Sequence, residues 1–212
     1  MADRVREIPG SSGPLEALVD MPIGPPRVAV VFAHPLPTAG GTMHTKVVFQ
    51  CAKALTRIGA VVLRFNFRGV GSSAGTWDNG RGEMDDYRAA IAYMGSQYAN
   101  LEIWAAGFSF GAYVATTVGA TEDRVCALIG IAPPVDKYEF GAVMVSPKPK
   151  FIVHGERDEL IPLRMVRHFY AHLAEPKELI VIDRANHLFE GQAGEVGDAL
   201  AELLEDFSCT KQ

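Results

Sequence analysis

One serine stands in a pattern that is typical of an enzymatic nucleophile. The segment Gly107-Phe-Ser-Phe-Gly111 has glycines two positions before and after Ser109, and it lies between an apolar run and a helical pattern. Glycines at this spacing let a strand and a helix approach closely around a strained turn, so that the serine hydroxyl points outward. The alternative is that Ser109 only caps the following helix. The context of the motif favours nucleophilic chemistry.

A serine nucleophile needs a base to take its proton and a third group to orient that base. The sequence offers both after the serine, first an acid and then a histidine. Asp158 follows the apolar run 150–154, and His187 follows the run 178–182. We therefore expect His187 to take the proton from Ser109 and Asp158 to hold the imidazole through its other nitrogen.

Three other carboxylates compete for the role of Asp158, namely Glu156, Glu159 and Asp183. Asp183 is close to His187 in sequence, but its position is more typical of a turn residue at the end of a strand.

The oxyanion that forms during attack on a carbonyl needs two hydrogen-bond donors. The backbone N–H of Phe110, directly after the candidate nucleophile, is expected to be one donor. The other should come from the loop 34–43, in which the prolines cannot donate, so the N–H of Leu36 is the candidate. His34, in the same loop, is expected to form structural hydrogen bonds rather than act as a second base.

Six apolar runs rich in β-branched residues alternate with helical patterns, which predicts an α/β domain with a mostly parallel sheet and helices on both faces. The expected strands are residues 27–33, 60–67, 101–106, 125–131, 150–154 and 178–182. The expected helices are residues 45–58, 82–98, 110–119, 163–173 and 195–207. Residues 4–8 and 15–19 predict an edge hairpin. Ligands bind at the carboxyl ends of such strands, where the candidate residues lie.

Length and composition exclude several classes of protein. The 212 residues are 48% hydrophobic and 21% charged, which is typical of a soluble protein, and we expect a single domain over residues 1–212. The net charge of −5 argues against nucleic-acid binding. No apolar run approaches the ~20 residues needed to cross a bilayer. The charged start, Met1 to Glu7, lacks the apolar middle of a secretory signal, so a cytoplasmic location is expected.

The three cysteines, Cys51, Cys126 and Cys209, are far apart and odd in number. This spacing is not typical of a zinc site or a disulfide framework, so all three are expected to be reduced.

Together, the segments G-F-S-F-G, G-E-R-D-E-L-I-P and N-H-L-F resemble the α/β-hydrolase superfamily over nearly the whole chain. Within it, H-P-L-P-T-A-G-G-T-M and R-F-N-F-R-G-V-G-S-S-A-G resemble small bacterial serine hydrolases related to dienelactone hydrolases and acyl-peptidase-like enzymes. The resemblance implies the α/β-hydrolase fold. The sequence departs from the group at Leu36, where members usually carry a second histidine, and Ser109 replaces the cysteine nucleophile of dienelactone hydrolases proper.

The superfamily commonly inserts a cap domain after the strand that follows the nucleophile helix. Only residues 132–149 are available for it here, too few for a helical cap, so we expect an open site. Four residues of this stretch could form an apolar wall for an acyl or alcohol group, or could merely cover the core: Tyr138, Phe140, Val143 and Met144. An open, shallow site favours short-chain or bulky esters.

Two further patterns point to other chemistry. Residues 69–74 match G-x-G-x-x-A, but a loop follows instead of the helix that dinucleotide binding requires. His168 and His172 have a metal-binding spacing without an evident third ligand. We therefore expect neither a cofactor nor a metal.

The sequence thus predicts a serine hydrolase that cleaves small-molecule carboxylic esters through an acyl-enzyme. Thioesters, lactones and acyl-peptides can be cleaved by the same three residues, and pocket shape decides among them. A hydrolase fold kept only for binding is the alternative from another class. The sequence does not indicate an oligomeric state.

Overall fold

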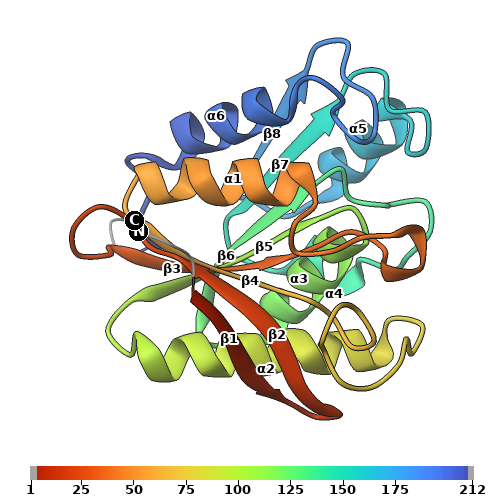
Figure 1. The fold of residues 1–212 in the computed structure, drawn as a ribbon. Coiled ribbons are helices and arrows are strands. Elements are labelled where there is room, and N and C mark those ends of the chain that lie inside the picture. The colour runs from red at the N-terminus through yellow and green to blue at the C-terminus, as the bar shows by residue number, and fades with distance from the viewer. Residues whose placement is uncertain (1–3, 210–212) are drawn as a thin grey trace.

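Alternation of buried strands and amphipathic helices produces an eight-stranded sheet between helical layers in this computed structural model (Figure 1). The structure describes residues 4–209, so the first three residues of the charged N-terminal stretch lie outside it. The strand order is β1-β2-β4-β3-β5-β6-β7-β8. The hairpin of β1 and β2 pairs antiparallel with β4, and all other neighbours are parallel. The prediction of a mostly parallel sheet with an edge hairpin is confirmed.

The element boundaries lie close to those expected. The strands are β1 (Arg4–Gly10), β2 (Gly13–Asp20), β3 (Val28–Ala33), β4 (Ala60–Phe65), β5 (Glu102–Phe108), β6 (Val125–Ile131), β7 (Lys150–Gly155) and β8 (Lys177–Ile182). The helices are α1 (Lys46–Arg57), α2 (Arg81–Gln97), α3 (Phe110–Thr121), α4 (Gly141–Val145), α5 (Leu163–His172) and α6 (Ala193–Leu204), with a short 3-10 helix at Pro37–Ala39.

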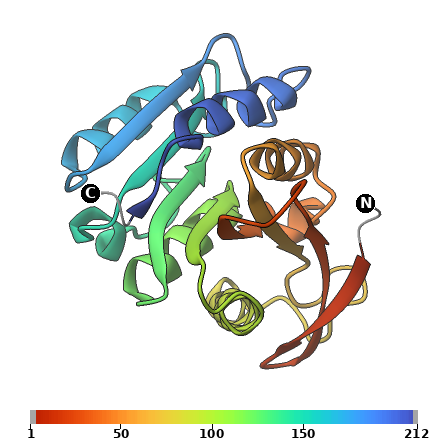
Figure 2. The same ribbon diagram turned by 90° about the vertical axis from the view of Figure 1, so that its left-hand side faces the viewer.

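Two apolar cores hold the helices against opposite faces of the sheet, and Figure 2 shows the twisted sheet between them. One core contains residues of α1 and α6, and Trp104 of β5 is its largest fully buried side chain. The other contains residues of α2, α3 and α5. Strands β3, β4 and β7 are buried at every position, as expected for parallel strands covered on both sides.

The connection between β6 and β7 contains only the five-residue helix α4, so no helical cap covers the carboxyl edge of the sheet there. Among the described residues, no helix combines the length and the apolar character needed to cross a membrane.

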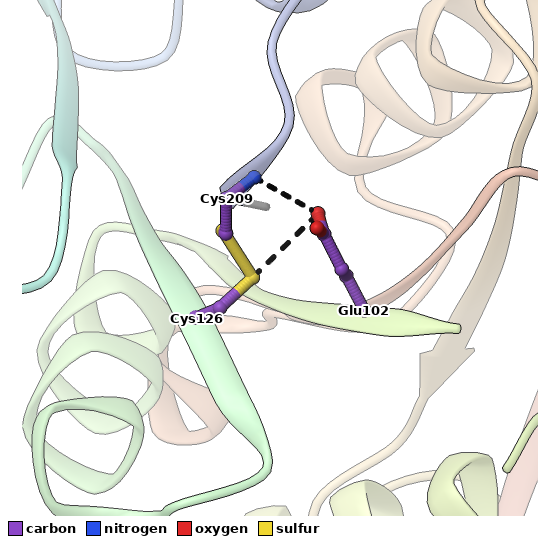
Figure 3. A group of neighbouring side chains, drawn as sticks. All are labelled: Glu102, Cys126 and Cys209. Atoms are coloured by element: carbon purple, nitrogen blue, oxygen red, sulfur yellow. Dashed lines mark hydrogen bonds between the residues drawn. A yellow bond between two sulfur atoms is a disulfide. The ribbon is translucent and has the colours of Figure 1, made fainter. Parts of the chain in front are cut away.

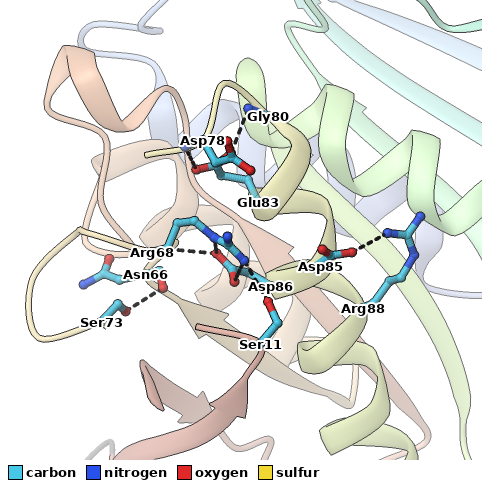
Figure 4. Close-up of polar contacts among 10 residues, drawn as sticks. All are labelled: Ser11, Asn66, Arg68, Ser73, Asp78, Gly80, Glu83, Asp85, Asp86 and Arg88. Atoms are coloured by element: carbon cyan, nitrogen blue, oxygen red, sulfur yellow. Dashed lines mark hydrogen bonds and ion pairs between the residues drawn. The ribbon is translucent and has the colours of Figure 1, made fainter. Parts of the chain in front are cut away.

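A buried ion pair fixes the long connection between β4 and α2 (Figure 4). The guanidinium of Arg68 donates to both carboxylate oxygens of Asp86, at 2.8 and 3.0 Å, and to Ser11. The hydrogen bond to Asp86 raises the pKa of Arg68. At the start of α2, the carboxylate of Glu83 accepts from the backbone N–H of Gly80 at 2.7 Å, which satisfies one of the free donors of the helix end. Hydrogen bonds therefore fix this connection both at Arg68, shortly after β4, and at Gly80, just before α2.

The expectation of three reduced cysteines is wrong for two of them. Cys126 of β6 and Cys209 have Cα atoms 6.2 Å apart and form a disulfide (Figure 3). The reason is that the segment after α6 returns beside β5, where Glu102 accepts hydrogen bonds from the hydroxyl of Ser208 and the backbone N–H of Cys209 at 3.0 and 3.1 Å. Cys51 is free, as expected, and it is buried.

The disulfide also bears on location. Disulfides persist mainly in oxidising compartments. A cytoplasmic location therefore stays a prediction that this disulfide does not favour.

Removal of the disulfide should lower the stability of the chain measurably. It closes a loop with a sequence separation of 83 residues. A loop of this size contributes about 2–4 kcal/mol by restricting the unfolded chain. For a domain of this size we expect the Tm of the double variant Cys126→Ser/Cys209→Ser to fall by about 5–12 °C. Thermal unfolding with and without dithiothreitol checks this, because the reductant should lower the Tm of the wild type and leave the double variant unchanged. A wild-type Tm that is indifferent to reductant would contradict the disulfide.

Candidate active site

Ser109 occupies a strained turn between β5 and α3. Its backbone has φ 53° and ψ −120°, a region that few residues other than glycine adopt. The turn is possible because two glycines flank it closely. A Cβ atom on Gly107 would lie 2.1 Å from the carbonyl oxygen of Gly111, and one on Gly111 would lie 2.5 Å from the carbonyl oxygen of Ala33. Positions 107 and 111 therefore leave no room for a side chain, which is the reason the sequence pattern gave for glycine on both sides of Ser109.

The structure brings Ser109, His187 and Asp158 together at the carboxyl edge of the sheet. The Oγ of Ser109 lies 2.9 Å from Nε2 of His187, and Nδ1 of His187 lies 2.7 Å from Oδ2 of Asp158. A carboxylate can only accept, so Nδ1 carries the proton and Nε2 is left to accept from the serine hydroxyl. The imidazole is thus held in the tautomer that can remove a proton from Ser109.

The carboxylate of Asp158 is buried and accepts several hydrogen bonds. Its Oδ1 accepts from the backbone N–H groups of Leu160 and Ile161, at 2.9 and 2.8 Å. Burial alone would raise the pKa of Asp158, but the hydrogen bonds from His187 and Ile161 outweigh it and hold the pKa below its ordinary value. Asp158 therefore stays ionised and can stabilise an imidazolium at His187.

The competing carboxylates have other partners. Glu156 accepts from the backbone N–H of Arg184 at 2.8 Å, and Glu159 accepts weakly from the backbone N–H of His187, not from its ring. Asp183 is exposed. Among the described residues, the carboxylate that bonds the His187 ring is that of Asp158.

His154 is a buried residue at this site that the sequence did not point out, because it lies inside an apolar strand pattern. Its Nε2 donates to the carbonyl oxygen of Ile161 at 2.8 Å and lies 3.4 Å from Oδ2 of Asp158. Burial lowers the pKa of His154, so its ring is neutral. The residue fixes the loop that supplies two N–H donors to Asp158.

The two candidate oxyanion donors lie beside the nucleophile. Leu36 and Phe110 line the same hollow as Ser109 and His187. The N–H of Phe110 belongs to the first turn of α3, where the helix leaves backbone donors unpaired. The carbonyl oxygen of Leu36 accepts from Gly41 at 3.0 Å, so the loop turns tightly around it.

His34 anchors this loop, as expected for a structural residue. Its ring is fully buried, with Nε2 accepting from the backbone N–H of Phe67 at 3.1 Å and Nδ1 donating to the carbonyl oxygen of Pro35 at 2.6 Å. Burial lowers the pKa of His34 to about 4. A neutral ring is needed here, because a protonated Nε2 could not accept from Phe67.

The expected apolar wall needs correction. Tyr138 lines the hollow beside Ser109, but Phe140 and Val143 are packed in the core and Met144 lines a different hollow. The reason is that α4 turns its buried side toward α3 and α5, away from the nucleophile. Lys137, which the sequence did not single out, is part of the lining.

The two competing motifs lie in a turn and on a helix. Residues 69–74 form a turn closed by a hydrogen bond from Gly69 to the carbonyl oxygen of Ala74, and the next helix begins only at Arg81. His168 and His172 lie on α5, where Nδ1 of His172 donates to the carbonyl oxygen of His168.

Comparison with known proteins identifies the family. The model of the family described as serine aminopeptidase S33 matches residues 24–147, a segment that contains Ser109 and ends before Asp158 and His187. The chain belongs to this family of α/β-hydrolases. An uncharacterized protein of Rickettsia prowazekii is 32% identical to this family member over 204 residues, which cover 92% of this chain and 86% of the relative.

Solved structures extend the likeness to the whole fold. An alpha-beta serine hydrolase homologue from Coxiella burnetii is 38% identical, with a TM-score of 0.92 and coverage of 96% of this chain and 98% of its own. A serine hydrolase without a lid from Xanthomonas campestris is 35% identical, with a TM-score of 0.89 and coverage of 95% and 93%. The expected fold and the lack of a cap are confirmed.

The buried His34 should make the protein less stable in acid. Its pKa is about 4 in the native state, against about 6.5 in an unfolded chain. Between these values only the unfolded state binds the proton, so the free energy of unfolding falls as the pH drops from about 6.5 to 4, by roughly 3 kcal/mol from this residue. Urea unfolding at several pH values measures the loss, and ring-proton NMR assigns it. A His34 ring that titrates near pH 6.5 would refute its neutral, buried role.

Proposed function

We propose that the chain is a serine hydrolase that cleaves carboxylic esters, with Ser109, His187 and Asp158 as its catalytic triad. The observation that carries the proposal is the continuous hydrogen-bonded path from Ser109 Oγ through both ring nitrogens of His187 to Asp158. Family membership and two similar serine hydrolase structures, one of them without a lid, support the same class of chemistry.

The reaction follows from the positions of these atoms. The Oγ of Ser109 attacks the ester carbonyl carbon while its proton passes to Nε2 of His187, and the backbone N–H groups of Phe110 and Leu36 donate to the oxyanion. His187 then returns the proton to the leaving alcohol, which leaves an acyl group on Ser109. A water molecule, deprotonated by the same Nε2, attacks this acyl group. Nε2 then returns that proton to Oγ as the bond between Oγ and the acyl carbon breaks, which releases the acid and restores Ser109. Asp158 stabilises the imidazolium in both halves of the reaction.

The lining of the site favours an ester over a peptide with a free amino terminus. The family description names aminopeptidases, which must accommodate a substrate ammonium group. Among the described residues that line the hollow around Ser109, none is Asp or Glu, and Lys137 adds a positive charge. An ammonium group would find no counter-charge there. Thioesters and lactones need not carry an ammonium group, so the lining does not disfavour them.

The size of the hollow favours short acyl or alcohol groups. Its volume is about 190 Å³, and its walls are mainly apolar, with Leu36, Tyr138, Ile161 and Leu188 among them. Most binding sites for drug-sized ligands are larger, at about 300–1,000 Å³. A long neutral chain would leave this hollow and lie on the protein surface.

The variant Ser109→Ala should lose turnover of p-nitrophenyl butyrate by at least about 10⁴-fold, because it lacks the hydroxyl that forms the acyl-enzyme. Labelling by a fluorophosphonate should disappear with it. Ser96→Ala, which removes an exposed hydroxyl on α2, is the matched control and should keep both properties. Turnover that survives in Ser109→Ala would exclude this residue as the nucleophile.

Initial rates on p-nitrophenyl esters from acetyl to palmitoyl test the size of the substrate. We expect kcat/KM to be highest for the short acyl chains that the hollow can hold, and to fall toward palmitoyl. A faster reaction with palmitoyl than with butyryl esters would show that the small hollow does not limit the substrate.

A further inference from the structure

A second and larger hollow lies between α4 and α5, and the mechanism does not use it. Its volume is about 600 Å³. Four apolar side chains form part of its lining: Val135, Met144, Met165 and Phe169. None of these four is fully buried, so the hollow is an accessible apolar surface rather than a sealed core cavity.

A row of basic side chains runs along the same hollow. Arg164, His168 and His172 line it and lie four residues apart on α5, which places them on one side of the helix. The rings of His168 and His172 are 4.5 Å apart. Arg164 is exposed and has no hydrogen-bond or ion-pair partner within the described part of the chain. This guanidinium is therefore available to an anion from outside.

Residues close together in the chain line the two hollows at two places. Pro134 lines the hollow of Ser109 and the next residue, Val135, lines the second hollow. Likewise Ile161 lines the first hollow, and Arg164, in the first turn of α5, lines the second. A ligand held at Ser109 can thus extend over the 134–135 segment onto α5.

The residues that line the two hollows include basic side chains and no carboxylate, although the chain as a whole is acidic. The chain has 25 acidic and 20 basic residues, with a net charge of −5. Within the described residues that line the two hollows, none is Asp or Glu, whereas Lys137 and Arg164 are permanent cations. Such a local reversal of charge favours anionic ligands and excludes cationic ones.

We propose that the second hollow is a substrate subsite that binds an apolar arm ending in an anionic group. The arm lies on Met165 and Phe169, and Arg164 pairs with a terminal carboxylate or phosphate. This inference rests on the proposed ester hydrolysis at Ser109 and narrows its substrates to esters that carry a negative charge at a distance from the cleaved bond.

Binding without turnover tests the subsite independently of the triad. In the Ser109→Ala background, calorimetry compares octanoate, octyl phosphate and neutral octanol. We expect the anions to bind more tightly than octanol and Arg164→Gln to weaken their binding about fivefold, a size typical of an accessible ion pair. Arg167→Gln, which removes an exposed arginine of α5 outside the lining, is the matched control and should not weaken it. The stronger of the two anions identifies carboxylate or phosphate as the group that the site prefers.

Hydrolysis of matched esters tests the same subsite in the reaction. One pair carries the charge on the acyl arm, p-nitrophenyl octanoate against p-nitrophenyl hydrogen suberate. The other carries it on the alcohol arm, octyl butyrate against 8-butyryloxyoctanoate. We expect the charged member of at least one pair to have the higher kcat/KM, and Arg164→Gln to reduce that ratio about fivefold where Arg167→Gln does not.

The outcomes separate the two proposals. Anion binding that is the same in Arg164→Gln and Arg167→Gln would overturn the subsite whatever the esterase does. Anion binding that depends on Arg164, in a protein that hydrolyses none of the esters, would overturn the proposed hydrolysis and leave an anion-binding surface. If neither ester pair shows a preference for charge although neutral esters are cleaved, the hollow is not a substrate subsite.

Discussion

Parallel pairing of the central strands is the constraint on which the site depends. Because β5, β6, β7 and β8 run in the same direction and in fixed register, their carboxyl ends meet at one edge of the sheet. Ser109 directly follows β5, while Asp158 and His187 lie in the turns after β7 and β8. Each side chain therefore arrives at the site from its own strand. A slip of one residue in any of these pairings would turn the neighbouring side chains to the opposite face.

A chain of buried polar contacts connects the beginning of α2 to the loop that carries Leu36. Asp86 of α2 accepts from both the guanidinium and the backbone N–H of Arg68, and the neighbouring Phe67 donates to His34. His34 in turn begins the loop that carries Leu36. Buried ion pairs of this kind contribute little net stability against an apolar alternative, but breaking one is costly. Their effect here is to hold the loop beside Ser109 in one position.

The parts of the structure that obey a local rule could be predicted from the sequence. Strand and helix periodicity gave the α/β order, and the glycine spacing around Ser109 gave the turn. Contacts that depend on the path of the whole chain could not be predicted. Cys126 and Cys209 meet only because the segment after α6 returns to β5. In the stretch 132–149, Tyr138 lies before the short helix α4 and lines the hollow of Ser109, whereas Met144 lies on α4 and lines the other hollow. No periodic pattern in the sequence predicts this difference.

The backbone of Ser109 carries a further consequence. A residue with a Cβ atom at φ 53° and ψ −120° is strained by about 1–3 kcal/mol, and glycine would relieve most of that strain. The residue that suits the turn best is therefore not the residue found there. A mutation to glycine at this position would increase the thermostability of the chain while removing its hydroxyl. The strain at this turn is thus the loss of stability that accompanies a hydroxyl held at the carboxyl end of β5.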